Sequence, residues 1–217
     1  MYSWGDCMSN EKLIQKFNKQ AIVYEMRRRK QTEKKWREKL IRCAKGTVLE
    51  VGAGAGANFQ FYTEDVVVTA VDFSKEMLNK AKEAAAESGV RAEFIHSDVE
   101  SLSFPDDSFD TVVSTLTLCG YEDPVKVLTS FNKWCKRDGL ILLMEHGISS
   151  NRFVGYLQSA IDPVSMKVSG CHLNRNLTRI FQQSNIRMNK VEHYLLDTVQ
   201  LVWAAPNKDI SGKYTLN

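Results

Sequence analysis

Apolar residues follow two different patterns along the chain, and the pattern changes near Gly46. Between residues 10 and 44, apolar side chains return every three or four positions, which predicts helix, and a polar stretch in the middle indicates a break between two helices. Beyond Gly46 the apolar residues form short continuous runs, which are typical of strands covered on both faces. The runs that predict strands are residues 47–51, 66–71, 92–96, 109–114 and 139–145.

Helical patterns separate these runs. Ser74 is placed to cap a helix that ends near Ser88–Gly89, and Pro124 is placed at the start of another. Strands that alternate with helices predict a parallel sheet with helices on both faces. Farther along, the weaker patterns predict helices at 153–161 (followed by Pro163) and 174–184, and strands at 190–194 and 199–204. Because no repeat or linker divides the 217 residues, we expect one domain.

Cysteine usage and apolar runs limit the class of protein. The five cysteines are scattered, odd in number and never spaced C-x-x-C, which argues against a disulfide framework or a structural zinc site. The adjacent Cys171 and His172 do not face one another on regular structure, so we expect no Cys–His dyad between them. No metal-ligand cluster is evident along the chain, so we expect no metal. The first ten residues lack the apolar core of a secretory signal, and no apolar run approaches the roughly 18 residues of a membrane span. We therefore expect a cytoplasmic protein.

Charge is distributed unevenly. The net charge is +3, yet Arg27–Lys45 holds ten Lys and Arg against two Glu. This segment is either a solvated helix face, with Glu and Arg four residues apart, or a peripheral contact with an anionic membrane surface. No nucleic-acid-binding motif accompanies it, so we expect no nucleic acid as a partner. The sequence does not indicate the oligomeric state.

The stretch LEVGAGAGANF, residues 49–59, follows the first predicted strand. Its small residues allow a ligand to approach the backbone closely. A Walker loop is excluded because no Gly-Lys-Ser/Thr follows. Gly52-x-Gly54-x-x-Ala57 fits the dinucleotide pattern, and Asp72 lies 20 residues after Gly52, where an acid accepts hydrogen bonds from ribose hydroxyls. Both a nicotinamide dinucleotide and any other adenosine-containing cofactor meet that requirement, so Asp72 alone does not choose between them.

The neighbouring motifs narrow the choice. They are E-V-G-A-G-A-G (50–56), V-D-F-S (71–74), S-D-V-E (97–100), F-P-D-D-S-F-D (104–110) and L-L-M-E-H (142–146). In this order and spacing, the chain resembles the class I S-adenosylmethionine-dependent methyltransferases. Segments 58–62, 115–119, 145–147, 162–163 and 170–175 are similar to the branch that holds quinone, phospholipid and alkyl-thiol methyltransferases.

The resemblance implies a Rossmann-like, doubly wound, mostly parallel seven-stranded sheet whose last strand is antiparallel. It also implies an N-terminal helical lid (1–45), a cofactor-binding core (46–147), a substrate-side segment with the last strands (148–206) and a tail (207–217). The implied cofactor is S-adenosylmethionine, with S-adenosylhomocysteine as its product. The residues implied to bind it are Glu50, Gly52, Ala53, Gly54 and Gly56 at the glycine loop, Asp72 at the ribose, and Phe73, Met77, Asp98, Val99, Thr115 and Leu116 around the adenine.

Methyl transfer from a sulfonium requires mainly alignment of the acceptor and exclusion of water. Glu145 and His146 are the best-placed ionisable residues, and His146 has the ordinary pKa of a general base. The alternative role for His146 is to orient a loop or a helix. Cys119 is expected to line the pocket, and Tyr24 either to close over the cofactor or to pack in the core. The leading hypothesis is an enzyme that methylates a small apolar or amphiphilic molecule of thiol, lipid or quinol type. The alternative is a non-catalytic regulatory protein that binds the same cofactor.

Overall fold

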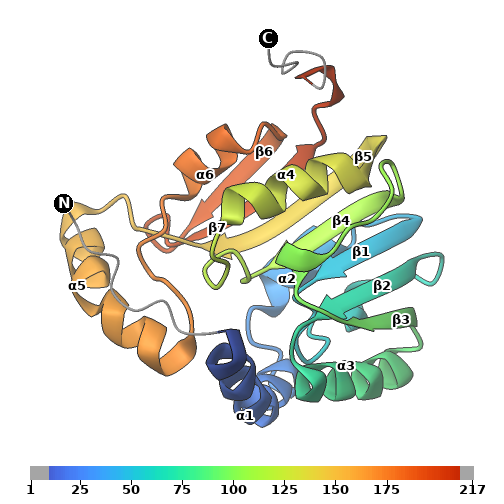
Figure 1. Ribbon diagram of the computed structural model, residues 1–217, viewed down its shortest axis with the longest axis horizontal. Coiled ribbons are helices and arrows are strands. Elements are labelled where there is room, and N and C mark those ends of the chain that lie inside the picture. The colour runs from blue at the N-terminus through green and yellow to red at the C-terminus, as the bar shows by residue number, and fades with distance from the viewer. Residues whose placement is uncertain (1–9, 211–217) are drawn as a thin grey trace.

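The computed structural model describes residues 10–210 of the chain (Figure 1). The predicted tail lies largely outside these residues. The helices are α1 (Asn10–Arg29), α2 (Lys34–Ile41), α3 (Lys75–Ser88), α4 (Pro124–Trp134), α5 (Arg152–Ser169) and α6 (Leu177–Gln183). The strands are β1 (Thr47–Val51), β2 (Val67–Asp72), β3 (Arg91–His96), β4 (Phe109–Thr115), β5 (Cys135–His146), β6 (Arg187–Tyr194) and β7 (Val199–Ala205).

The seven strands form one sheet in the order β3-β2-β1-β4-β5-β7-β6. The first five strands in the chain pair in parallel, and β7 pairs antiparallel with both β5 and β6. This confirms the predicted Rossmann-like sheet with an antiparallel last strand. The reversal of strand order beside β1 creates the switch point at which such sheets bind ligands.

Two apolar clusters cover the two faces of the sheet. On one face α4 and α6 pack over the central strands, with Phe131, Trp134 and Phe181 buried. On the other, α2, α3 and the 3-10 turn Phe59–Phe61 pack over β1, β2 and β5. The β-branched runs are therefore buried on both sides, as their lack of polar alternation predicts.

The helical stretch before β1 breaks where the polar residues predict, between α1 and α2. Gln31 and Glu33 turn the chain there with left-handed φ angles of 53° and 59°. Much of the positive charge of Arg27–Lys45 is paired within the molecule. The pairs are Arg28 with Glu87, Arg29 with Glu25 and Glu87, Arg37 with Glu33, Lys39 with Glu192, and Arg42 with Glu38.

Helix α5 continues past Pro163 to Ser169, whereas the sequence pattern predicts a helix only to residue 161. A proline inside a helix removes one backbone hydrogen bond and costs about 3 kcal/mol. Tertiary contacts hold the final turns of α5 in place, because Lys16 of α1 donates a hydrogen bond to the carbonyl of Met166 at 3.2 Å. Figure 1 shows α5 beside α1, standing away from the sheet. In the described part of the chain, no helix combines the length and hydropathy needed to cross a bilayer.

Candidate active site

The glycine loop leaves β1 with three glycines at positive φ, namely Gly52 (65°), Gly54 (54°) and Gly56 (74°). A Cβ on Gly52 would lie 2.3 Å from Cγ2 of Thr117, and one on Gly56 would lie 2.8 Å from Cβ of Ala84. A Cβ on Gly54 would meet only the Tyr24 ring, at 3.8 Å. Gly52 and Gly56 are therefore required for packing, whereas Gly54 keeps open the space beside its backbone.

Asp72 ends β2 and holds the glycine loop. Its Oδ2 accepts a hydrogen bond from the backbone N–H of Gly54 at 2.9 Å, and its Oδ1 accepts one from that of Ser74 at 2.8 Å. Burial raises the pKa of Asp72 to about 6, although both N–H groups favour the carboxylate. Each carboxylate oxygen can accept a second hydrogen bond, so Asp72 can still bind a diol.

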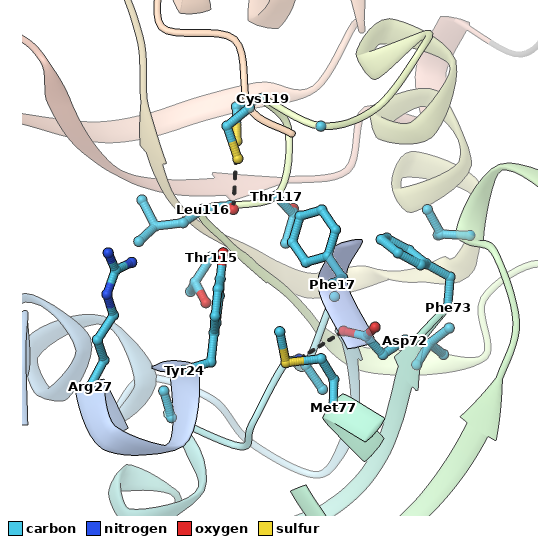
Figure 2. Close-up of a pocket in the computed structure, with 18 of the residues that line it drawn as sticks. Phe17, Tyr24, Arg27, Asp72, Phe73, Met77, Thr115, Leu116, Thr117 and Cys119 are labelled. Carbon is cyan, nitrogen blue, oxygen red and sulfur yellow. Dashed lines mark hydrogen bonds between the residues drawn. The ribbon is translucent and has the colours of Figure 1, made fainter. Parts of the chain in front are cut away.

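A cavity of about 290 Å³ opens at the carboxyl ends of the parallel strands. Figure 2 shows Asp72, Phe73 and Met77 at one end of it, with Phe17 from α1 above them. The Phe17 and Phe73 rings meet edge to face, with centroids 5.1 Å apart. The predicted cofactor residues that line the cavity are Gly52, Ala53, Gly54, Asp72, Phe73, Met77, Asp98, Val99, Thr115 and Leu116. Asp98 also caps the turn after β3 by accepting a hydrogen bond from the backbone N–H of Glu100.

Two of the predicted cofactor residues, Glu50 and Gly56, do not line the cavity, so we assign them a supporting position. Glu50 is 1% exposed and accepts hydrogen bonds from Asn58 Nδ2 at 3.0 Å and the Tyr62 hydroxyl at 2.7 Å. Burial raises its pKa to about 7. Asn58 in turn donates to Thr115 Oγ1, which does line the cavity. Successive side chains of a strand point to opposite faces of the sheet, and the Glu50 side chain points to the face on which Asn58 and Tyr62 pack.

Glu145, a predicted ionisable candidate, is likewise buried and supports the turn after β4. It accepts hydrogen bonds from the Ser114 hydroxyl and from the backbone N–H groups of Thr117 and Leu118. That turn places Leu116 at a φ of 60°, a conformation that non-glycine residues rarely adopt. The carboxylate of Glu145 is therefore engaged in shaping the wall of the cavity and does not face the ligand space.

Helix α1 forms the outer wall. Tyr24 lies over Gly54, and the Arg27 guanidinium lies 5.7 Å from the centre of the Tyr24 ring (Figure 2). Burial raises the pKa of Tyr24 far above its usual value, so it stays neutral. Arg28 also lines the cavity, and its buried Nε and Nη2 atoms have no hydrogen-bond partner among the described residues. An unpaired guanidinium edge in a cavity wall fits an anionic group of a ligand.

The other end of the cavity holds a cluster of sulfur and imidazole groups. Cys119 follows β4, His146 ends β5 and Cys171 follows α5. One ligating atom from each lies within 4.8 Å of those of the other two. The sequence pattern did not indicate a metal-ligand cluster, and the structure brings these three candidate ligands together. The adjacent Cys171 and His172 form no dyad, as predicted, because the His172 ring hydrogen-bonds Asp162 at 2.8 Å and the Cys171 sulfur lies near His146.

The three groups alter one another's protonation. A hydrogen bond with Cys119 lowers the pKa of the Cys171 thiol to about 5, against the effect of burial, and His146 lowers it further. The same contact raises the pKa of Cys119, which remains a thiol. Burial lowers the pKa of His146, but its contact with Cys171 outweighs this and raises it overall. These shifts favour the thiolate form of Cys171, beside His146, at the end of the cavity away from Asp72.

Comparison with known proteins agrees with this geometry. Residues 49–143 match the family model described as a methyltransferase domain. The thiol S-methyltransferase TMT1B of Mus musculus is 32% identical over 189 residues, covering 82% of this chain and 73% of the relative. A phosphatidylethanolamine N-methyltransferase of Cereibacter sphaeroides is 37% identical over 103 residues, covering 46% of this chain and 51% of the relative. A SAM-dependent methyltransferase from Aquifex aeolicus shares the fold, with a TM-score of 0.53, 21% identity, and coverage of 74% and 82%.

A Rossmann-like sheet with a buried acid, Asp72, beside a glycine loop is the arrangement found in enzymes that bind nucleoside cofactors. Within that class, the chain belongs to the class I S-adenosylmethionine-dependent methyltransferases. It spans about half the length of several of the curated relatives it matches. The methyl donor of this family is S-adenosylmethionine, and the cavity fits it, because Gly54 leaves room at the loop, Asp72 can accept further hydrogen bonds, and Arg28 offers an unpaired edge.

Proposed function

We propose that this protein transfers a methyl group from S-adenosylmethionine to the sulfur of a small, apolar or amphiphilic thiol. The alignment with the mouse thiol S-methyltransferase is the observation that favours a thiol as the acceptor. It runs over 189 residues, well beyond the 95 residues matched by the family model, whereas the phospholipid N-methyltransferase aligns over only 103. In class I methyltransferases the acceptor segments lie outside the common core, so a match beyond that core is informative about the acceptor.

The proposed cofactor pose follows the polarity of the cavity. Asp72 would accept the ribose hydroxyls, Phe73 and Val99 would enclose the adenine, and Asp98 would face its amino group. Arg28 would receive the carboxylate at the opposite end of the cofactor. The cofactor supplies a methyl group already activated by a positively charged sulfur, so these residues need only hold it in line with the acceptor.

At the acceptor end, apolar side chains exclude water and the sulfur–imidazole cluster receives the acceptor. Leu13 and Leu173 line the same cavity as the cluster. We propose that His146 and Cys171, whose ligating atoms lie within 4.8 Å of each other, together favour the thiolate form of the acceptor. This keeps the role predicted for His146 in proton transfer, now shared with a partner from a distant segment.

The test is to incubate the protein with methyl-labelled S-adenosylmethionine and, separately, an alkyl thiol, phosphatidylethanolamine vesicles or a demethylated quinol. Label on the thiol sulfur is the expected result. Label only on the lipid or the quinol would show that the acceptor class is wrong. No label on any acceptor, with S-adenosylhomocysteine bound, would favour the non-catalytic regulatory protein. Asp72→Ala is the negative control, and Asp65→Ala, at an exposed position, is its matched control.

We also propose that the protein contacts a membrane surface, and that α5 makes this contact more directly than the basic segment. The outward face of α5 is apolar, with Phe153 and Tyr156 71% and 73% exposed and Ile161, Val164 and Val168 also exposed. Arg152 and Lys167 stand near its ends, and its one acidic residue, Asp162, is buried. An apolar face flanked by positive charge suits a bilayer that carries anionic lipid.

Sedimentation with vesicles tests this contact. The double substitution Phe153→Ser with Tyr156→Ser is expected to weaken binding at least about tenfold, because each large apolar side chain contributes about 1.5 to 3 kcal/mol when buried. The matched control is Met188→Ser, at an exposed apolar residue on β6. If the double variant binds as the wild type does, α5 is not the contact. If the double substitution Lys34→Glu with Lys35→Glu abolishes binding and the α5 variant does not, the basic segment Arg27–Lys45 makes the contact.

A further inference from the structure

The sulfur–imidazole cluster has the composition of a metal site with one open position. In tetrahedral zinc sites, Zn–S bonds of about 2.3 Å and Zn–N bonds of about 2.0 to 2.1 Å place the ligand atoms about 3.4 to 3.8 Å apart. The ligating atoms of Cys119, His146 and Cys171 all lie within 4.8 Å of one another, an upper bound about 1 Å above those distances. Two thiols and an imidazole favour zinc over magnesium or calcium, which prefer oxygen.

The backbone holds the three ligands in this arrangement. His146 is fixed in the sheet by its pairing with Val199 of β7. The segments that carry Cys119 and Cys171 are tied together, because the backbone N–H of His172 donates to the carbonyl of Cys119 at 3.1 Å. Asp162 of α5 then anchors the second segment by accepting hydrogen bonds from the Leu173 N–H at 2.6 Å and the His172 ring at 2.8 Å. Such outer contacts are what keep metal ligands oriented.

The cluster lies where a metal ion with an open coordination position would face the substrate cavity. All three residues line the same cavity as Asp72 and the glycine loop. Three protein ligands plus one exchangeable position is the pattern of catalytic zinc sites, and Cys2His is one of its known ligand sets. A thiol is a good fourth ligand for zinc, and coordination favours its deprotonated form.

We propose that Cys119, His146 and Cys171 bind one zinc ion, and that the acceptor thiol occupies its fourth position. The inference rests on the proposed function, whose acceptor it narrows to a zinc-bound thiolate. The acceptor thiol releases its proton to solvent on binding. Its sulfur then forms a bond to the methyl carbon as the bond between that carbon and the cofactor sulfur breaks, and the neutral thioether product leaves as a weaker ligand. Zinc changes no oxidation state in this step.

Cobalt(II) provides the direct test, since it replaces zinc and absorbs by thiolate-to-metal charge transfer. Fully reduced protein is titrated with cobalt(II) without oxygen, and one equivalent is expected to give the charge-transfer band, which added zinc then removes. The variants Cys119→Ala, His146→Ala and Cys171→Ala are each expected to bind at least about 100-fold more weakly, since loss of a residue that merely orients a ligand already costs about 10- to 100-fold. Cys43→Ser and His193→Ala are the matched controls, because both residues are exposed and lie outside the cavity.

Two results would overturn the site. One is a reduced wild-type protein that gives no band, and the other is a Cys171→Ala variant that keeps the band. Binding of S-adenosylhomocysteine, measured on every variant, shows whether the fold and the cofactor end are intact.

The role in catalysis is tested separately. Removal of the metal with a chelator is expected to abolish methylation of an alkyl thiol, leave the affinity for S-adenosylhomocysteine unchanged, and be reversed by zinc. Thiol methylation that persists in metal-free protein would overturn the zinc-bound thiolate while leaving the proposed function in place. A protein that binds both cobalt and S-adenosylhomocysteine but never methylates a thiol would contradict the proposed function. It would also contradict the assignment of the acceptor thiol as the fourth zinc ligand.

Discussion

The two ends of the cavity are built in different ways. At the cofactor end, the glycine loop and Asp72 are 20 residues apart or less, and the backbone N–H of Gly54 donates a hydrogen bond directly to the Asp72 carboxylate. At the acceptor end, Cys119, His146 and Cys171 come from three segments that tertiary structure alone brings together. The first end depends on local chain geometry, and the second on how the sheet, α5 and the connecting segments pack. A substitution should therefore affect one end and spare the other, except where the two touch.

The largest expected effect is a loss of stability on substitution of Gly52, which packs against Thr117 between the two ends of the cavity. An alanine there would carry the strain of a positive φ, about 1 to 2 kcal/mol, and a contact of 2.3 Å with Thr117, worth about 1 to 3 kcal/mol. We expect Gly52→Ala to lower the free energy of unfolding by about 2 to 5 kcal/mol, measured by urea denaturation. Gly89→Ala is the control, since Gly89 has a φ of 71° but nothing within 4 Å. Equal losses in the two variants would show that the contact with Thr117 adds nothing.

The next largest effect separates the ends. Asp72→Ala is expected to weaken S-adenosylhomocysteine binding about 100-fold, because hydrogen bonds to a charged group contribute about 1.5 to 3 kcal/mol each. Calorimetric titration measures it, and the cobalt band of the acceptor end should persist. Unchanged affinity would remove Asp72 from the cofactor site and contradict the proposed pose.

The pH dependence of S-adenosylhomocysteine affinity tests the role of Asp72 further. The pKa of Asp72 is raised by burial to about 6, and the ribose hydroxyls require its carboxylate form. Protons therefore compete with the ligand as the pH falls through 6, and affinity at pH 5 should be about tenfold below that at pH 7.5. Asp72→Asn should show no such decline over this range. A decline of equal size in Asp72→Asn would assign the pH dependence to another group.

The smallest effect concerns Arg28. Its unpaired Nε and Nη2 atoms are proposed to meet the cofactor carboxylate, so Arg28→Ala should weaken binding of S-adenosylhomocysteine about 5- to 10-fold. Adenosine, which lacks that carboxylate, should bind both proteins equally. Arg29→Ala is the control, because Arg29 makes only surface ion pairs and should change affinity less than twofold. An equal loss of adenosine affinity would show that Arg28 acts through the fold of α1.

The sequence predicts the cofactor end of the cavity better than the acceptor end. The sheet and its helices occupy the expected places, because strand periodicity and the glycine pattern are local properties. Ten of the twelve residues predicted to bind the cofactor line the cavity. Glu50 and Gly56 belong to the motif but do not line the cavity. Alternation along β1 directs the Glu50 side chain to Asn58 and Tyr62, and Gly56 packs closely against Ala84.

The acceptor end was less accessible to prediction. Cys119 and His146 both follow strand ends that meet at one edge of a parallel sheet, which was a usable signal. Cys171 gave no such signal, because its place depends on α5 extending past Pro163 and on the tie between His172 and Cys119. Helical spacing likewise does not reveal that Phe17 and Arg28 face the cavity, since the same spacing serves core packing.

One measurement addresses the central claim that the two ends act separately in thiol methylation. Wild-type protein and Cys171→Ala are compared for S-adenosylhomocysteine affinity and for transfer of labelled methyl to an alkyl thiol, in the same preparations. The account predicts labelled thioether from the wild type, at least about 100-fold less from the variant, and equal affinities. Equal methylation by the two proteins, or transfer only to lipid or quinol, would contradict it.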